Sequence, residues 1–135
     1  MNEQAAEAWA LPGSVAYVED VPFMFGGICT NCRSVVFPKP GICPSCWSTK
    51  IEKVQLPRTG TLYSFTVVHV ARKGWRVPYV IAYIDLEEGV RVSAPIACDP
   101  SSPPPIGCTV ELDVKEIYRQ EDGTPVLSHC FRKQD

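Results

Sequence analysis

The most regular pattern in the chain is an alternation of apolar and polar residues near its C-terminal end. Over residues 108–118, Val110, Leu112 and Val114 are separated by charged residues. Successive side chains of a strand point to opposite faces, so this pattern predicts a strand with one buried face. The turn signal EDGTP follows at residues 121–125. A last short strand is therefore expected after this turn.

The segments around this strand predict a β-barrel. Residues 61–70 are rich in β-branched and aromatic side chains, and residues 77–86 are apolar almost throughout, which we interpret as burial on both faces near a sheet centre. A turn at Glu88-Gly89 predicts a hairpin. The expected strands cover residues 61–70, 77–86, 90–96, 108–118 and 126–131. Five strands and a proline-rich connection predict a five-stranded OB-fold barrel, with a small β-sandwich as the alternative.

The N-terminal half has shorter patterns. Residues 3–10 favour a two-turn helix by composition, and residues 14–25 favour an extended chain. Within residues 29–56, two prolines and a glycine in RSVVFPKPGI exclude a long helix, so short β-ribbons are expected there. We therefore predict a mainly β protein in three parts: a lead-in with one short helix at 1–28, a metal-binding ribbon at 29–56, and a barrel at 57–135.

Composition narrows the possible functions. The chain has 135 residues, 45% of them apolar, and a formal net charge of −2, so a generally basic nucleic-acid-binding protein is not indicated. Seven cysteines, an odd number, argue against a complete secreted disulfide framework. The first residues lack the pattern of a signal peptide, and no apolar run reaches the roughly 18 residues of a membrane span. These features favour a soluble cytoplasmic protein.

Four of the cysteines have the spacing of a metal site. Cys29, Cys32, Cys43 and Cys46 form the pattern C-x2-C-x10-C-x2-C, in which two tight turns can direct four thiolates at one ion. Zinc is the expected ion and iron the runner-up. Two local disulfides or a redox-active pair are the alternatives. Four thiolates leave no open position for water, so a structural role is expected.

Other residues form no catalytic set that the sequence reveals. His69 and His129 lack an identifiable partner, and three further cysteines are expected to be structural: Cys98, Cys108 and Cys130. The acidic residues Asp85, Glu87 and Glu88 are expected to serve a hairpin turn.

A basic and aromatic cluster, ARKGWR, lies at residues 71–76 in an expected turn between strands. Arg72, Lys73 and Arg76 surround Trp75. A protein interface is our first interpretation, because tryptophan and arginine are enriched in interface hot spots. Contact with the phosphates and adenine of CoA is the second, and single-stranded nucleic acid the third. A solvated basic turn is the structural alternative.

Three phrases of the sequence resemble a known family. These are CTNCRSVVFPKPGICPSCWS from residue 29, GTLYSFTVVH from residue 60 and PYVIAYIDLEEGVR from residue 78. In this order, over about residues 25–131, they resemble small proteins that join a rubredoxin-like zinc ribbon to an OB-fold barrel and accompany thiolases and related acyl-CoA enzymes. Within the family, the short separate chain is most similar to thiolase subunits of anaerobic aromatic breakdown.

The resemblance implies a function that composition alone does not. Members of the family are non-catalytic partners of a thiolase-type subunit in a hetero-oligomer, where they shape the substrate tunnel or contact the CoA thioester. The resemblance also exposes two departures. Family members often carry glycine after the second cysteine of each pair, where this chain has Arg33 and Trp47. Many members also carry aromatic-bearing N-terminal helices before the ribbon, whereas this chain has one candidate helix of two turns, so we expect residues 1–28 to dock on the partner.

Two functions from other classes stay open at this stage. A single-stranded nucleic-acid-binding module would use the ARKGWR cluster, although the net charge weakens this alternative. A rubredoxin-like electron carrier would hold iron at the four cysteines. We include Arg33 and Trp47, together with the four residues of ARKGWR named above, as candidate contacts to a partner or to CoA.

Overall fold

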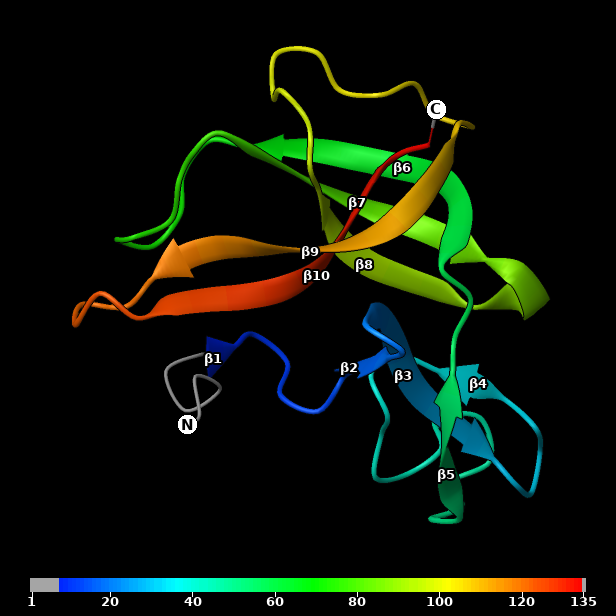
Figure 1. Ribbon diagram of the computed structural model, residues 1–135. Coiled ribbons are helices and arrows are strands. Elements are labelled where there is room, and N and C mark those ends of the chain that lie inside the picture. The colour runs from blue at the N-terminus through cyan, green and yellow to red at the C-terminus, as the bar shows by residue number, and fades with distance from the viewer. Residues whose placement is uncertain (1–7, 135) are drawn as a thin grey trace.

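The C-terminal half of the chain folds into a closed five-stranded barrel. The computed structural model describes residues 8–134 (Figure 1). The barrel strands are β6 (Thr59–Val68), β7 (Tyr79–Leu86), β8 (Arg91–Ile96), β9 (Thr109–Arg119) and β10 (Pro125–Lys133). They pair in the order β6-β7-β8-β10-β9, and β9 pairs again with β6. The β8–β10 pair is parallel and the others are antiparallel. This closure confirms the predicted OB-fold and excludes an open sandwich.

The alternation predicted for β9 is confirmed at Val110 and Leu112, which are almost fully buried in the barrel core, while Glu111 between them is only partly covered. Val114, predicted on the same buried face, is only half-buried, like its neighbours Asp113 and Lys115. The interpretation of residues 77–86 as buried on both faces is wrong. In β7, Val80, Ala82 and Ile84 are buried, but Tyr83 between them is 53% exposed. The wall of a small barrel has one face in the core and one toward solvent, whatever the hydropathy of its outer residues.

The ribbon is built around one long strand. Strand β3 (Val21–Cys29) pairs first with β2 (Val15–Val18) and then with β4 (Val35–Val36) and β5 (Ile51–Gln55). The extended chain predicted at residues 14–25 and the short ribbons predicted after it are therefore present. Strand β3 runs across residue 28, so the lead-in and the ribbon share one sheet.

The helix predicted over residues 3–10 falls mainly outside the described residues. Its described part differs from the prediction, because Ala8–Trp9 form a short strand, β1, that pairs in parallel with Val126 and Leu127 of β10. An isolated two-turn helix is marginal in water, whereas the edge of β10 offers backbone partners to these residues. Among residues 8–134, the one helical segment is the 3-10 turn Glu87–Gly89, and no helix is long and apolar enough to cross a membrane.

The ribbon and the barrel share a hydrophobic core. Met24 of β3 and Leu56, just after β5, are buried in the same cluster as the barrel residues. The Leu56 N–H donates to the Met24 carbonyl at 2.9 Å, which holds the two side by side. Removing such side chains from water stabilises by about 2 kcal/mol each, so the two parts are fixed to one another by ordinary core packing.

Candidate metal centre

The four ligand cysteines lie on two turns with the same hydrogen bonds. In the first turn, the Cys29 N–H donates to the Ser34 carbonyl and the Arg33 N–H donates to the Cys29 carbonyl, at 2.9 and 2.8 Å. In the second turn, the Cys43 N–H donates to the Ser48 carbonyl and the Trp47 N–H to the Cys43 carbonyl, both at 2.8 Å. The first turn ends β3, and the second lies between β4 and β5.

The residue after the second cysteine of each turn has a left-handed backbone. The φ angle is 72° at Arg33 and 69° at Trp47. This region is strained for side chains with a Cβ and is natural for glycine, which agrees with the glycine that the family resemblance leads us to expect at these places. The two substitutions noted in the sequence thus occupy equivalent strained positions, one on each turn.

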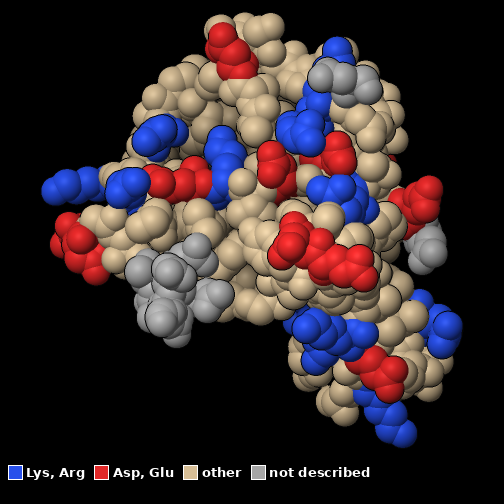
Figure 2. All heavy atoms as spheres, viewed as in Figure 1, with Lys and Arg blue, Asp and Glu red and all other residues tan. Residues whose placement is uncertain are grey.

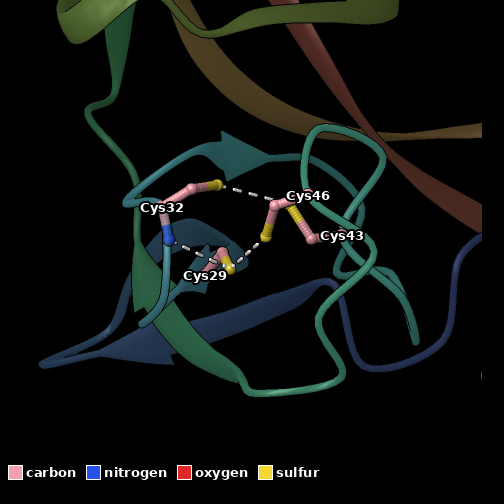
Figure 3. Close-up of side chains that lie close together, drawn as sticks. All are labelled: Cys29, Cys32, Cys43 and Cys46. Carbon is pink, nitrogen blue, oxygen red and sulfur yellow. Dashed lines mark hydrogen bonds between the residues drawn. The ribbon is translucent and has the colours of Figure 1, made fainter.

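The sulfur atoms converge on one point. All four Sγ atoms lie within 4.8 Å of one another, with Cys29–Cys46 at 3.6 Å and Cys32–Cys43 at 3.5 Å (Figure 3). Zn–S bonds of about 2.3 Å in a tetrahedron would place the sulfurs about 3.8 Å apart. A disulfide needs about 2.05 Å, so these distances fit ligands around an ion rather than the alternative of local disulfides.

Hydrogen-bond donors around the sulfurs favour thiolates. The Cys32 N–H lies 3.5 Å from Cys29 Sγ and lowers the pKa of that thiol, and Asn31 Nδ2 donates to Cys46 Sγ at 3.3 Å. Hydrogen bonding between Cys32 and Ser34, through the side chain and the backbone, lowers the pKa of Cys32 to about 6. Burial instead raises the pKa of Cys43. Metal ligands must be deprotonated, so this donor set fits a cation at the predicted site.

The ARKGWR cluster lies far from the metal centre. It forms the loop between β6 and β7, which together with the β9–β10 turn extends at the end of the barrel away from the ribbon (Figure 1). Arg72, Lys73 and Arg76 are exposed. Two of them, Arg72 and Lys73, line an open cavity of about 770 Å³, which is also lined by residues 119–121.

Trp75 holds this loop against the barrel. Its ring stacks on Tyr118 of β9 with centroids 5.0 Å apart, and Tyr79 of β7 lies 5.2 Å away. An isolated β-bridge joins the backbones of Trp75 and Tyr118. Trp75 is therefore a packing residue in this structure, and the basic side chains around it form the accessible part of the cluster.

The remaining candidates have structural surroundings. His129 is buried, and burial lowers its pKa, whereas His69 is exposed just after β6. Burial raises the pKa of Cys98 and raises that of Cys130 to about 12, so both thiols are unreactive at neutral pH. Asp85 forms an ion pair with Arg91 at 2.6 Å beside the hairpin turn.

Sequence reasoning missed one residue that connects the two parts. Arg58, which follows Pro57 in the linking segment, donates to the Pro22 carbonyl in β3 and to the Leu112 carbonyl in β9, and pairs with Glu111 at 2.9 Å. Nothing in its local sequence distinguishes it from a solvated arginine, because its partners lie 36 and more positions away.

Comparisons with known proteins agree with this arrangement. Residues 25–52 match the model of the ChsH2 rubredoxin-like zinc ribbon domain, and residues 53–115 match that of the ChsH2 C-terminal OB-fold domain. The solved structure of an Ltp2-ChsH2(DUF35) aldolase superposes with a TM-score of 0.62 and 27% identity, covering 82% of this chain and 84% of that chain.

Curated relatives come from bacteria and archaea. Benzoylsuccinyl-CoA thiolase subunit BbsA of Thauera aromatica is 40% identical over 114 residues, which are 83% of this chain and 77% of that protein. A DUF35 domain-containing scaffold protein of Methanocaldococcus jannaschii is 42% identical over 114 residues, 81% of this chain and 80% of that protein. Both similarities extend over the ribbon and the barrel together.

Proposed function

We propose a function for this chain from the premise that it belongs to the family defined by the ChsH2 zinc ribbon and OB-fold domains. The chain acts as a non-catalytic accessory subunit of a thiolase-type acyl-CoA complex, and its partner performs the thiolytic C–C bond cleavage. The observation that carries this proposal is the 40% identity to a thiolase subunit over most of both chains. The resemblance noted in the sequence is thereby confirmed at the level of the family.

The metal in this proposal is one structural zinc ion. Cys29, Cys32, Cys43 and Cys46 would hold it, and four thiolates complete a tetrahedral shell without a place for substrate or water. Zinc, which has no redox chemistry, suits this role better than iron. A colourless protein with one equivalent of zinc by elemental analysis supports the assignment, and a coloured iron form contradicts it.

The chain contributes to the assembly of the complex and to the shape of the substrate tunnel in the catalytic subunit. The rigid join between the ribbon and the barrel allows two distant surfaces to engage the same partner, one at each end of the molecule. Exposed Arg72 and Lys73 beside the open cavity provide a place where the phosphates of a CoA thioester would find cations. We place the substrate among aromatic acyl-CoA thioesters and the complex in the cytoplasm, because the Thauera relative is named for benzoylsuccinyl-CoA thiolase and reduced thiolates need a reducing compartment.

Co-expression tests the proposal. The chain is produced together with a thiolase-type protein from the same organism, and the mixture is separated by gel filtration. We expect one hetero-oligomeric peak with thiolase activity, and no activity from the purified chain alone. Separate elution of the two proteins, or thiolase activity in the isolated chain, would contradict an accessory role.

A further inference from the structure

Trp47 occupies a position where folding of this chain would favour glycine. Its backbone is left-handed, with a φ of 69°, and its side chain is 78% exposed. Its backbone N–H makes the turn's hydrogen bond to Cys43, which any residue other than proline would supply. Among the described residues, its ring has no aromatic or cation–π contact, in contrast to that of Trp75.

A second apolar side chain stands at the same turn. Ile42, directly before Cys43, is 52% exposed. Ile42 and Trp47 thus flank the second cysteine pair, on a turn held in place by the metal ligands. Exposed apolar side chains gain little from burial within this chain, and neighbouring ones are typical of the anchors of protein interfaces.

The ribbon also differs in charge from the rest of the chain. Residues 29–56 contain four basic residues and one acidic residue, a net charge of +3 in a chain whose total is −2. The four basic residues, Arg33, Lys39, Lys50 and Lys53, are all exposed. Figure 2 shows Lys and Arg side chains spread over the ribbon at the lower right of the view. A basic ribbon that carries an apolar anchor is complementary to an apolar pocket with an acidic rim.

We propose that Trp47 is the anchor by which the ribbon docks on the catalytic subunit, inserting into an apolar pocket that is rimmed by carboxylates. The inference rests on the accessory function proposed above and adds the surface and the chemistry of the contact. In this proposal, the free energy of binding that the Trp47 side chain contributes in the complex exceeds the free energy of folding that its left-handed backbone costs in the free chain. The basic residues of the ribbon steer association toward the acidic rim.

Replacing Trp47 with glycine separates folding from docking. In the free protein, Trp47→Gly relieves the left-handed strain, so we expect equal or higher thermal stability and full zinc content. In the complex, we expect the dissociation constant measured by calorimetry to rise by about 30-fold or more, the effect of losing an interface hot spot. Trp47→Phe should recover part of the affinity.

Arg33→Gly is the matched control, because Arg33 has the same backbone conformation on the equivalent turn. It should give a similar gain in stability, with a dissociation constant raised less than about 5-fold, since a rim charge contributes mainly to the association rate. The rate at which Arg33→Gly associates with the catalytic subunit should fall, and this rate should depend less on salt concentration than that of the wild type.

Four results would overturn the inference. Trp47→Gly binding within about 3-fold of the wild type would exclude Trp47 as the anchor and leave the accessory function in place. A less stable or zinc-depleted Trp47→Gly protein would show that the side chain serves folding. Binding of a single-stranded oligonucleotide at low salt that Trp47→Gly abolishes, with the protein complex intact, would assign this surface to nucleic acid. If the wild type forms no complex, the accessory function itself fails, and the inference fails with it.

Discussion

His129 shows how one buried polar residue joins the two parts of the molecule. It is 5% exposed, its Nε2 lies 3.0 Å from the Ser93 carbonyl in β8, and the ring of Phe37 from the ribbon meets its ring edge-on at 5.1 Å. Since a carbonyl accepts, Nε2 carries the proton, and burial disfavours the charged imidazolium. These contacts give His129 a structural role that the sequence did not reveal.

Folding stability should therefore fall as the pH falls below neutral. Burial holds the pKa of His129 below its ordinary value of about 6.5, so the unfolded chain takes up a proton at a pH where the folded chain does not. Between about pH 6.5 and the lower folded pKa, this difference removes up to about 1.4 kcal/mol of unfolding free energy per pH unit. Urea denaturation at a series of pH values, with a fixed excess of zinc, measures this change in unfolding free energy.

His129→Gln provides the comparison, because glutamine keeps a donor for the Ser93 carbonyl but does not titrate. The wild-type curve should fall more steeply than the variant's curve over this range, while loss of zinc at acid pH affects both. Parallel curves would show that His129 does not contribute to the pH dependence.

At the scale of elements, the ribbon depends on its metal. Its strands are short, with β4 having two residues and β5 five, and the long loop between them has no regular structure beyond its turns. A piece of this size has too little core to fold alone. The four thiolates compensate for the missing core, since apparent binding of structural zinc by small peptides contributes on the order of 10 kcal/mol.

Cys43→Ala should therefore unfold the ribbon and abolish the complex. Cys43 is a buried ligand, and three remaining cysteines hold zinc less tightly and leave a position open. Elemental analysis should show less than one equivalent of zinc, and gel filtration should show no complex. Cys108→Ala, which removes a cysteine outside the metal cluster, should retain both. A Cys43→Ala protein with full zinc and full partner binding would refute this view of the ribbon.

At the scale of the whole molecule, Arg58 links sheet to barrel. Its guanidinium contacts the Pro22 carbonyl of β3, Glu111 and the Leu112 carbonyl of β9, and it lies 5.8 Å from the ring centroid of Phe23. Its side chain is 25% exposed, so water screens these contacts less than at the open surface. The side chain of Arg58 therefore connects the sheet of the ribbon to the barrel.

Arg58→Met should lower the unfolding free energy by about 2–3 kcal/mol, because hydrogen bonds to charged groups are lost and the Leu112 carbonyl loses its donor. Arg91→Met is the control, since its ion pair with Asp85 is 47% exposed on the arginine side and should contribute at most about 1 kcal/mol. Guanidinium denaturation compares the two. Equal losses would indicate that Arg58 does not fasten the ribbon to the barrel.

The sequence by itself determined the features that depend on neighbours along the chain. Cysteine spacing predicts the metal turns because each turn closes within six residues, and alternation at residues 108–118 predicts β9 because side chains of a strand point to opposite faces in turn. The tertiary structure alone decided the parallel pairing of β8 with β10, the strand at Ala8–Trp9 and the contacts of Arg58 and His129. These depend on segments that are distant in sequence, and no local pattern specifies which two surfaces meet. Residues 77–86 show the limit of prediction from sequence. An apolar run predicts a strand but does not tell which of its faces the barrel will cover.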